Sequence, residues 1–250
     1  MAQLNGPLDI TGRIAGLIIF KDKNGKTIVK GSSGPSSKKV KTSNTFQVFR
    51  RYGSEHGLAS AAGRGLRIGL REIKEFCSSS NMYYRMTACL KRVLKADRTS
   101  PLGQRLISAG DPSPMEDFEW NDRLSLEEAL QADFSGGIDP ATGSMNLIIS
   151  SFTPSSHITF PEGATHFELI AVAAAWHPEE KKVTSEFQRT GSKPLTSKSI
   201  KAQTFQFSPI PSDHPILFIG LGIRFFSQAG EKSAPLKGGA FRVIKAVNRS

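Results

Sequence analysis

Basic side chains recur at helical spacing in two stretches of the chain and form its most ordered chemical pattern. In the first stretch the spacing is i, i+3, i+7 and i+10, which predicts one helix face. Cationic groups in register along a helix can neutralise successive phosphates of a nucleic acid and release counterions. A solvated or subunit-facing surface is the alternative, because no homeodomain, zinc-finger or RNP pattern accompanies them. The residues are Arg64, Arg67, Arg71, Lys74, Arg85, Lys91, Arg92 and Lys95.

A shorter basic cluster, Lys38, Lys39 and Lys41, directly follows residues 31–37, whose sequence is GSSGPSS. The Gly/Ser-rich composition is typical of a flexible linker, so the pattern predicts a solvated charged loop. Contact with nucleic acid is the other interpretation of these lysines.

Motifs for common catalytic and cofactor sites are absent from the sequence. There is no phosphate-binding P-loop, dinucleotide fingerprint, zinc-protease motif, serine-hydrolase elbow or EF-hand loop. The histidines lack metal-ligand spacing. We therefore expect a non-enzymatic protein with no cofactor, no metal and no identified small-molecule substrate. The histidines are His56, His157, His166, His177 and His214.

The two cysteines, Cys77 and Cys89, are 12 positions apart, which matches neither a zinc pair nor a redox CxxC motif. We expect two reduced thiols in helices. No signal-peptide pattern opens the sequence, and the most apolar runs, Leu169 to Trp176 and Ile216 to Phe226, are too short to span a bilayer. These features predict a cytoplasmic protein without a membrane anchor.

Charge is distributed unevenly along the 250 residues. The whole chain carries 33 Lys plus Arg and 22 Asp plus Glu, a formal charge of +11, with a pI near 9.8. Residues 1–100 hold 19 basic and 6 acidic residues, or +13, whereas residues 101–250 hold 14 and 16, or −2. The basic part is therefore expected to meet an anionic partner or the acidic surface of another subunit.

The first predicted element is a β-hairpin. An apolar run from Ile14 to Phe20 and the segment Thr27 to Lys30 flank Asn24-Gly25, which predicts a type I′ turn. An isolated hairpin is marginally stable in water, so both faces need cover, from the same chain or from another subunit. Together with two aromatic residues further on, this run is the predicted assembly interface. Its residues are Leu17, Ile18, Ile19, Phe20, Phe46 and Phe49.

Helices are expected after the linker. A helix begins near Thr42, with Ser43 or Asn44 as its N-cap, and the Gly/Ala-rich stretch Gly53 to Gly65 predicts either a tightly packed helix or a break. Two amphipathic helices follow, the second from about residue 81 to residue 96. Their predicted buried residues are Leu66, Leu70, Ile73 and Cys77 in the first, and Met82, Met86, Leu90 and Val93 in the second.

The remainder predicts an antiparallel β-sandwich, Ig-like or similar, and so an α+β fold. We expect a basic hairpin-and-helix region at 1–110, a transition segment at 111–131 with a short helix around Leu124 to Leu130, and the sandwich at 132–250. A Gly-rich hairpin connection is expected at 136–143. Strands are expected at 145–150, 166–176, 182–187, 202–207, 216–226 and 240–247.

Four segments carry a resemblance: TGRIAGLIIF (11–20), NGKTIVK (24–30), FPEGATHFEL (160–169) and KGGAFRVI (237–244). Together they resemble an uncharacterised family of Bacteroidota proteins, and the likeness covers nearly the whole chain in order. It implies a bacterial protein with this two-part layout. It implies no activity and no functional residues.

These patterns predict a structural protein that self-assembles into a homo-oligomer, such as a filament or tube. The sandwich would form the body, and the hairpin and helices would form the contacts between subunits. The alternative is a nucleic-acid-binding or coat-like protein that uses the basic helices.

Overall fold

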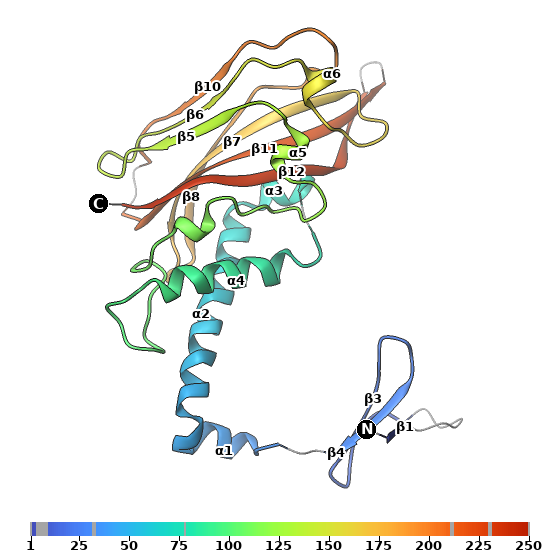
Figure 1. Cartoon of the computed structure of the whole chain (residues 1–250), viewed down its shortest axis with the longest axis vertical. Helices are drawn as coiled ribbons and strands as arrows, with labels where there is room; N and C mark the ends of the chain where they lie inside the picture. The colour runs from blue at the N-terminus through green and yellow to red at the C-terminus, as the bar shows by residue number, and fades with distance from the viewer. Residues whose placement is uncertain are drawn as a thin grey trace. The chain divides into compact units, whose positions relative to one another are not determined.

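The computed structural model describes residues 2–3, 10–31, 34–77, 79–210, 213–229 and 232–249. The chain forms two compact units, Met1–Arg50 (unit 1) and Arg51–Ser250 (unit 2). Figure 1 shows a small sheet and helices in the N-terminal part and antiparallel sheets in the C-terminal part. The predicted α+β class is confirmed.

Unit 1 contains a four-stranded antiparallel sheet with the order β1-β4-β3-β2. The strands are β1 (Ala2–Gln3), β2 (Gly12–Ile14), β3 (Leu17–Lys21) and β4 (Thr27–Gly31). The predicted hairpin is present as β3 and β4, and residues 22–26 connect the two strands.

The predicted type I′ turn at Asn24-Gly25 is wrong. That turn requires positive φ at both central residues, but only Gly25 has it, with φ +77°. Asp22 sets the loop instead, because its carboxylate accepts hydrogen bonds from the backbone N–H groups of Asn24 and Lys26, both at 2.9 Å.

The lysine cluster forms a helix, and the predicted loop there is wrong. Helix α1 (Ser37–Thr42) begins after Ser36, whose hydroxyl accepts a hydrogen bond from the Lys39 N–H at 3.2 Å. This cap satisfies one of the free N–H groups at the helix start. A single 3₁₀ turn, η1 (Asn44–Phe46), precedes α2 (Gln47–Gly69), and Ser43 makes no side-chain cap there.

The predicted amphipathic helices are present in unit 2. Helix α2 is continuous through Gly53 to Gly65, and Leu70 separates it from α3 (Arg71–Phe76). Helix α4 (Met82–Lys95) follows. The apolar residues predicted to be buried in these helices are all buried.

Glycines in α2 permit close packing, which decides between the two alternatives for this stretch. A Cβ added to Gly63 would lie 3.1 Å from Met86 Cγ of α4, and one added to Gly69 would lie 2.5 Å from Val183 Cβ. Neighbouring elements therefore occupy the space that a side chain would need.

Two antiparallel sheets make up the rest of unit 2, in the orders β10-β6-β5 and β12-β11-β7-β8, with β9 also paired to β7. The six predicted strands are present. The predicted hairpin connection at 136–143 begins too early, because residues 136–138 belong to β5 and pair with β6, so that residues 139–144 form the connection. Helical turns η2 (Ser113–Met115), α5 (Leu126–Ala129) and α6 (Pro154–His157) lie in connections. The strands are β5 (Phe134–Ile138), β6 (Met145–Ile149), β7 (His166–His177), β8 (Lys182–Arg189), β9 (Lys193–Pro194), β10 (Gln203–Phe207), β11 (Ile216–Ala229) and β12 (Lys232–Asn248).

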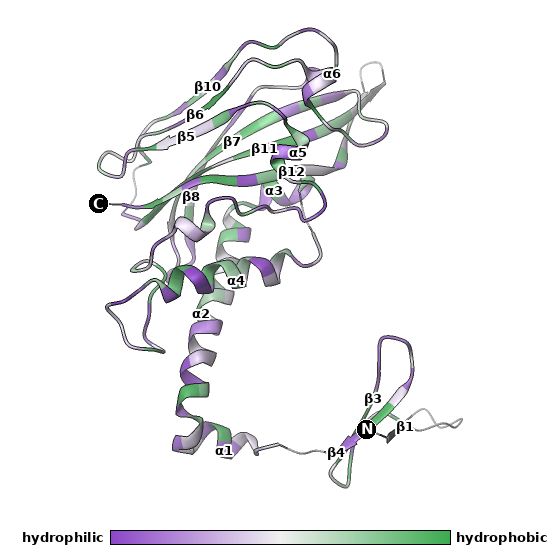
Figure 2. Cartoon of the chain, in the orientation of Figure 1, coloured by the Kyte–Doolittle hydropathy of each residue, from purple (hydrophilic) through white to green (hydrophobic). Residues whose placement is uncertain are grey.

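We call the sheet of β12, β11, β7, β8 and β9 the long sheet, and the sheet of β10, β6 and β5 the short sheet. The long sheet lies between two hydrophobic cores, with the helices on one face and the short sheet on the other (Figure 1). Successive residues of β7 alternate between the cores, so Ile170 packs with the helices and Leu169 with the short sheet. Figure 2 shows hydrophobic residues along β7 and β11. The β-sandwich is therefore confirmed, with a helical layer added outside it.

The helices share a core with the long sheet, so the predicted boundary at 111–131 is not where the units divide. Trp120, from the predicted transition segment, is fully buried and packs edge-to-face on Phe241 of β12, with ring centroids 5.6 Å apart. The division falls at Arg50, far earlier than predicted. The physical reason is that the predicted apolar helix faces need a partner, and the outer face of the long sheet supplies it.

Candidate functional site

One face of the N-terminal sheet is apolar across three strands except at its end row, where Lys21 pairs with Thr27. Residues directly opposite one another in antiparallel strands lie on the same face. Ile14 pairs with Leu17, and Ile19 pairs with Val29, so these four residues share one face, which we call the apolar face. Ile14 is 54% exposed and Leu17 is 42% exposed, whereas Ile19 is 9% exposed.

The opposite face of this sheet mixes apolar and basic groups. Arg13 and Lys30 both pair with Ile18, and Phe20 pairs with Ile28. The Lys30 ammonium lies 5.2 Å from the centre of the Phe20 ring. The four predicted interface residues of β3 thus divide between the faces, because side chains alternate along a strand.

Unit 1 has little core of its own. Among its described residues, Ile19 is the one apolar residue that is buried. Of the two aromatic residues predicted for assembly, Phe46 in η1 is half-buried and Phe49 in α2 is 65% exposed. A sheet that buries so few apolar residues is marginally stable by itself.

Arg85, a predicted phosphate contact, serves the fold of unit 2 instead. Its guanidinium donates hydrogen bonds to the backbone oxygens of Glu119, at 2.7 Å, and Trp120, at 3.1 Å. It also lies 5.4 Å from the centre of the Phe118 ring. These contacts fasten the segment before α5 to α4 and occupy the donors that a phosphate would need.

The remaining basic residues do not form one continuous stripe. Lys38, Lys39 and Lys41 are exposed on α1 of unit 1, and the others belong to unit 2. The break at Leu70 interrupts the predicted helix face between Arg67 and Arg71. Arg64, Arg71, Lys74, Arg92 and Lys95 are exposed, whereas Arg67 and Lys91 are half-buried.

A hollow of about 640 Å³ in unit 2 brings Arg64 together with Lys181, which is distant from it in the sequence. It is lined by α2, by Tyr83 of α4 and by Lys181 in the turn between β7 and β8. Ser60 also lines it and shares a hydrogen bond with the Tyr83 hydroxyl. The hollow thus gathers two cationic and two hydroxyl groups from three elements.

A second polar cluster lies where the segment before α5 meets β12. Arg242 forms ion pairs with Asp117 and with Glu127, the latter at 2.6 Å. Glu119 accepts a hydrogen bond from the Leu126 N–H at 3.0 Å through Oε1, and its buried Oε2 has no hydrogen-bond partner in the described structure. Burial raises the pKa of Glu119 to about 7. Glu116 accepts a hydrogen bond from the Ala246 N–H, so these carboxylates serve to attach the segment to β12.

Burial also makes the two thiols poor nucleophiles. Cys77 and Cys89 are both buried free cysteines. Burial raises the pKa of Cys77 to about 12, and it also raises the pKa of Cys89. The rings of His177 and His214 lie 6.0 Å apart, yet the described residues contain no group of three or more side chains able to hold a metal ion.

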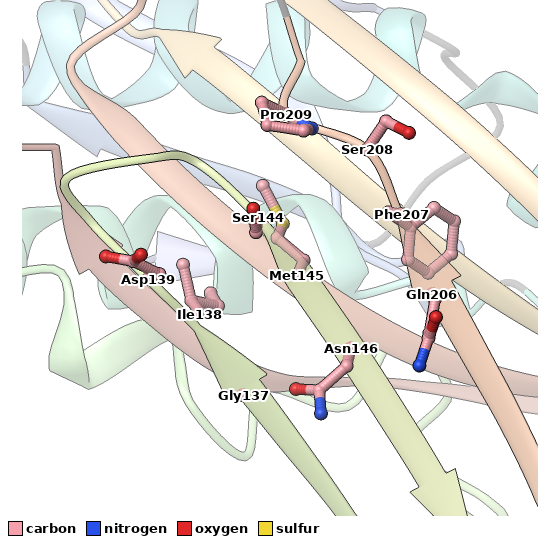
Figure 3. A pocket seen from close by; sticks show the side chains of 10 residues that line it. All are labelled: Gly137, Ile138, Asp139, Ser144, Met145, Asn146, Gln206, Phe207, Ser208 and Pro209. Carbon is pink, nitrogen blue, oxygen red and sulfur yellow. The ribbon is translucent and has the colours of Figure 1, made fainter.

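A second hollow, of about 670 Å³, lies at one end of the short sheet (Figure 3). Gly137, Asn146 and Gln206 are neighbours across its three strands. A Cβ at position 137 would lie 2.2 Å from Asn146 Oδ1, so glycine leaves room for the amide. Asp139 is held in its turn by Thr142 Oγ1 at 2.6 Å, and this bond lowers its pKa. The hollow therefore offers mainly neutral hydrogen-bonding groups.

Comparisons with protein-family models, with curated proteins and with solved structures find no match for this chain. The resemblance to a Bacteroidota family therefore stays a prediction. Within the described parts of the chain, none of the helices combines the length and the hydropathy needed to cross a membrane.

Proposed function

We propose that this chain is a non-enzymatic structural protein that self-associates through the apolar face of its N-terminal sheet. One observation carries the proposal: unit 1 forms a compact sheet with a single buried apolar residue among its described positions, while Ile14 and Leu17 remain about half exposed. Transfer of such side chains out of water is favourable, by about 1.5 to 3 kcal/mol for complete burial of each.

A second copy of the chain is the occupant that best fits this face. Residues 1–50 carry nine basic and two acidic residues, so two copies repel one another unless their charges stay in water. The rows Ile14–Leu17 and Ile19–Val29 contain no charge, and Arg13 and Lys30 lie on the opposite face. The end row of the same face, Lys21–Thr27, carries one ammonium group at its edge, where it can stay in water. Face-to-face packing of two such sheets buries the apolar rows and keeps both basic faces solvated.

Symmetry decides what such an interface can build. A face that packs on its own copy forms a closed twofold dimer, and extension into a filament or tube requires a second, different contact. The exposed Phe49 is a candidate for that contact.

Sedimentation velocity over a wide range of protein concentrations tests the proposal. Leu17→Lys should abolish association, because a charged side chain cannot be buried in the apolar rows without large cost. Ile148→Lys is a matched control, since Ile148 also lies on a strand and is 43% exposed, against 42% for Leu17. The control should associate like the unmodified chain.

Two results would refute self-association through this face. The first is an unmodified chain that stays monomeric at every concentration. The second is an equal loss of association in both lysine variants. Negative-stain microscopy of the unmodified chain separates filaments from closed dimers.

A further inference from the structure

We infer that the hollow lined by Ser60, Arg64, Tyr83 and Lys181 binds a phosphate group. The hollow lies wholly within unit 2, so the inference is independent of the proposed self-association. The phosphate can belong to a free phosphorylated molecule or to the backbone of a nucleic acid, and these two sources share the same recognition chemistry.

The charges that line the hollow are uncompensated. Neither the Arg64 guanidinium nor the Lys181 ammonium makes a hydrogen bond or ion pair with any residue that the structure describes, and no acidic residue lines the hollow. Elsewhere in unit 2, Arg242 and Arg224 are each paired with a carboxylate. Two cations at one concave site repel one another, and a bound dianion would relieve that repulsion.

The backbone at Lys181 supports the same conclusion. Lys181 occupies the left-handed region, with φ +60°, where glycine or asparagine is ordinarily preferred. Its Cβ lies 2.7 Å from the position that a Cβ on Gly65 would take, so α2 can pass this turn only because residue 65 is glycine. Lys181 therefore lies on the wall of the hollow because of two uncommon residue choices, a lysine at positive φ and a glycine inside a helix at position 65.

The hydroxyl groups supply a donor. Ser60 and Tyr83 are hydrogen-bonded to one another, which uses one of their two O–H groups and leaves the other to donate to a phosphate oxygen. The Arg67 guanidinium lies 5.1 Å from the centre of the Tyr83 ring and helps to hold that ring in place.

Isothermal titration calorimetry with inorganic pyrophosphate tests the site. Lys181→Asn should raise the Kd by about tenfold, because a charge-assisted hydrogen bond is lost. The Tm of Lys181→Asn should be equal to or higher than that of the unmodified chain, because asparagine tolerates positive φ. Lys74→Asn is the matched control, since Lys74 is exposed, lacks a described partner and does not line the hollow. Arg64→Gln should likewise raise the Kd. Arg71→Gln is its matched control, because Arg71 is exposed and does not line the hollow.

The inference is overturned if pyrophosphate does not bind the unmodified chain at low salt. It is also overturned if each variant and its control lose affinity equally, because that result means diffuse attraction. Competition with a single-stranded oligonucleotide then assigns the source of the phosphate. An oligonucleotide that displaces pyrophosphate identifies a nucleic-acid backbone, and one that fails to displace it identifies a free phosphorylated ligand.

Discussion

At the scale of single residues, Glu119 has a buried carboxylate oxygen, Oε2, without a hydrogen-bond partner among the described residues. Its neighbour Arg242 is already paired with Asp117 and Glu127, so little positive charge is left to compensate a buried carboxylate. The protonated form is therefore favoured, and the pKa rises from 4.5 to about 7. Burial against β12 distinguishes Glu119 from its exposed neighbours Asp117 and Glu127.

This environment predicts a pH-dependent stability. Because folding raises the pKa of Glu119, the contribution of its protonated form to the free energy of unfolding is fully present below pH 4.5. This contribution is lost as the pH rises through about 7. Glutamine cannot ionise, so Glu119→Gln should not show this fall in the free energy of unfolding with rising pH. The side chain of Glu119 keeps partial contact with water. The fall in the free energy of unfolding should therefore be about 1 to 2 kcal/mol larger for the unmodified chain than for Glu119→Gln.

Urea unfolding of the unmodified chain and of Glu119→Gln at a series of pH values measures this difference. Glu75→Gln, at an exposed position of α3, is the control and should follow the unmodified chain. Parallel pH profiles for Glu119→Gln and the unmodified chain would show that Glu119 does not titrate in this interval.

At the scale of elements, α2 combines glycines with opposite roles. The stretch Gly53 to Gly65 has low helix propensity, and yet the helix is continuous because packing outweighs propensity. Gly69 touches Val183 of β8, whereas nothing lies within 4 Å of a Cβ added to Gly57. The sequence pattern alone presents these two glycines as equivalent.

Alanine substitutions should distinguish the two positions. Gly57→Ala should raise the free energy of unfolding by up to about 1 kcal/mol, because alanine favours the helix. Gly69→Ala should lower it by about 1 to 3 kcal/mol, because the added methyl group overlaps Val183. Chemical denaturation of both variants provides the measurement, and stabilisation by Gly69→Ala would mean that α2 and β8 are not packed this closely.

At the scale of the whole molecule, unit 2 holds both hydrophobic cores. The buried residues of the two cores begin at Ala59, so none of them comes from unit 1. The basic excess, in contrast, is shared, because residues 1–50 contribute +7 of the total +11. Stability and proposed association therefore depend on different parts of the chain.

Deletion of residues 1–46 should separate these two properties. The remaining chain keeps α2 from its first residue and both cores, so its thermal unfolding should occur within a few degrees of the full chain, since about 1 kcal/mol shifts Tm by only about 2–4 °C at this size. It should also remain monomeric. Circular dichroism and sedimentation velocity measure the two properties, and a large fall in Tm would show that unit 1 supports the core of unit 2.

Local patterns in the sequence predicted the elements well. The periodicity of α4, the alternation along β6 and the turn residues between strands depend on neighbours within a few positions, so a window of sequence contains the information. The apolar run of β3 likewise indicated a hairpin with too little cover. The errors were local also: a capping hydroxyl at Ser36 and an Asx turn at Asp22 outweighed the composition of their segments.

Tertiary structure alone decided which of these elements share a core and which side chains meet. The helices pack on the long sheet and share one core with it, so the two units divide at Arg50 and not at the predicted segment 111–131. Packing turned Arg85 inward to two backbone oxygens and brought Lys181 beside Arg64. Such pairings join residues that are distant in the chain, and their free energy depends on the fit of whole faces rather than on any local preference.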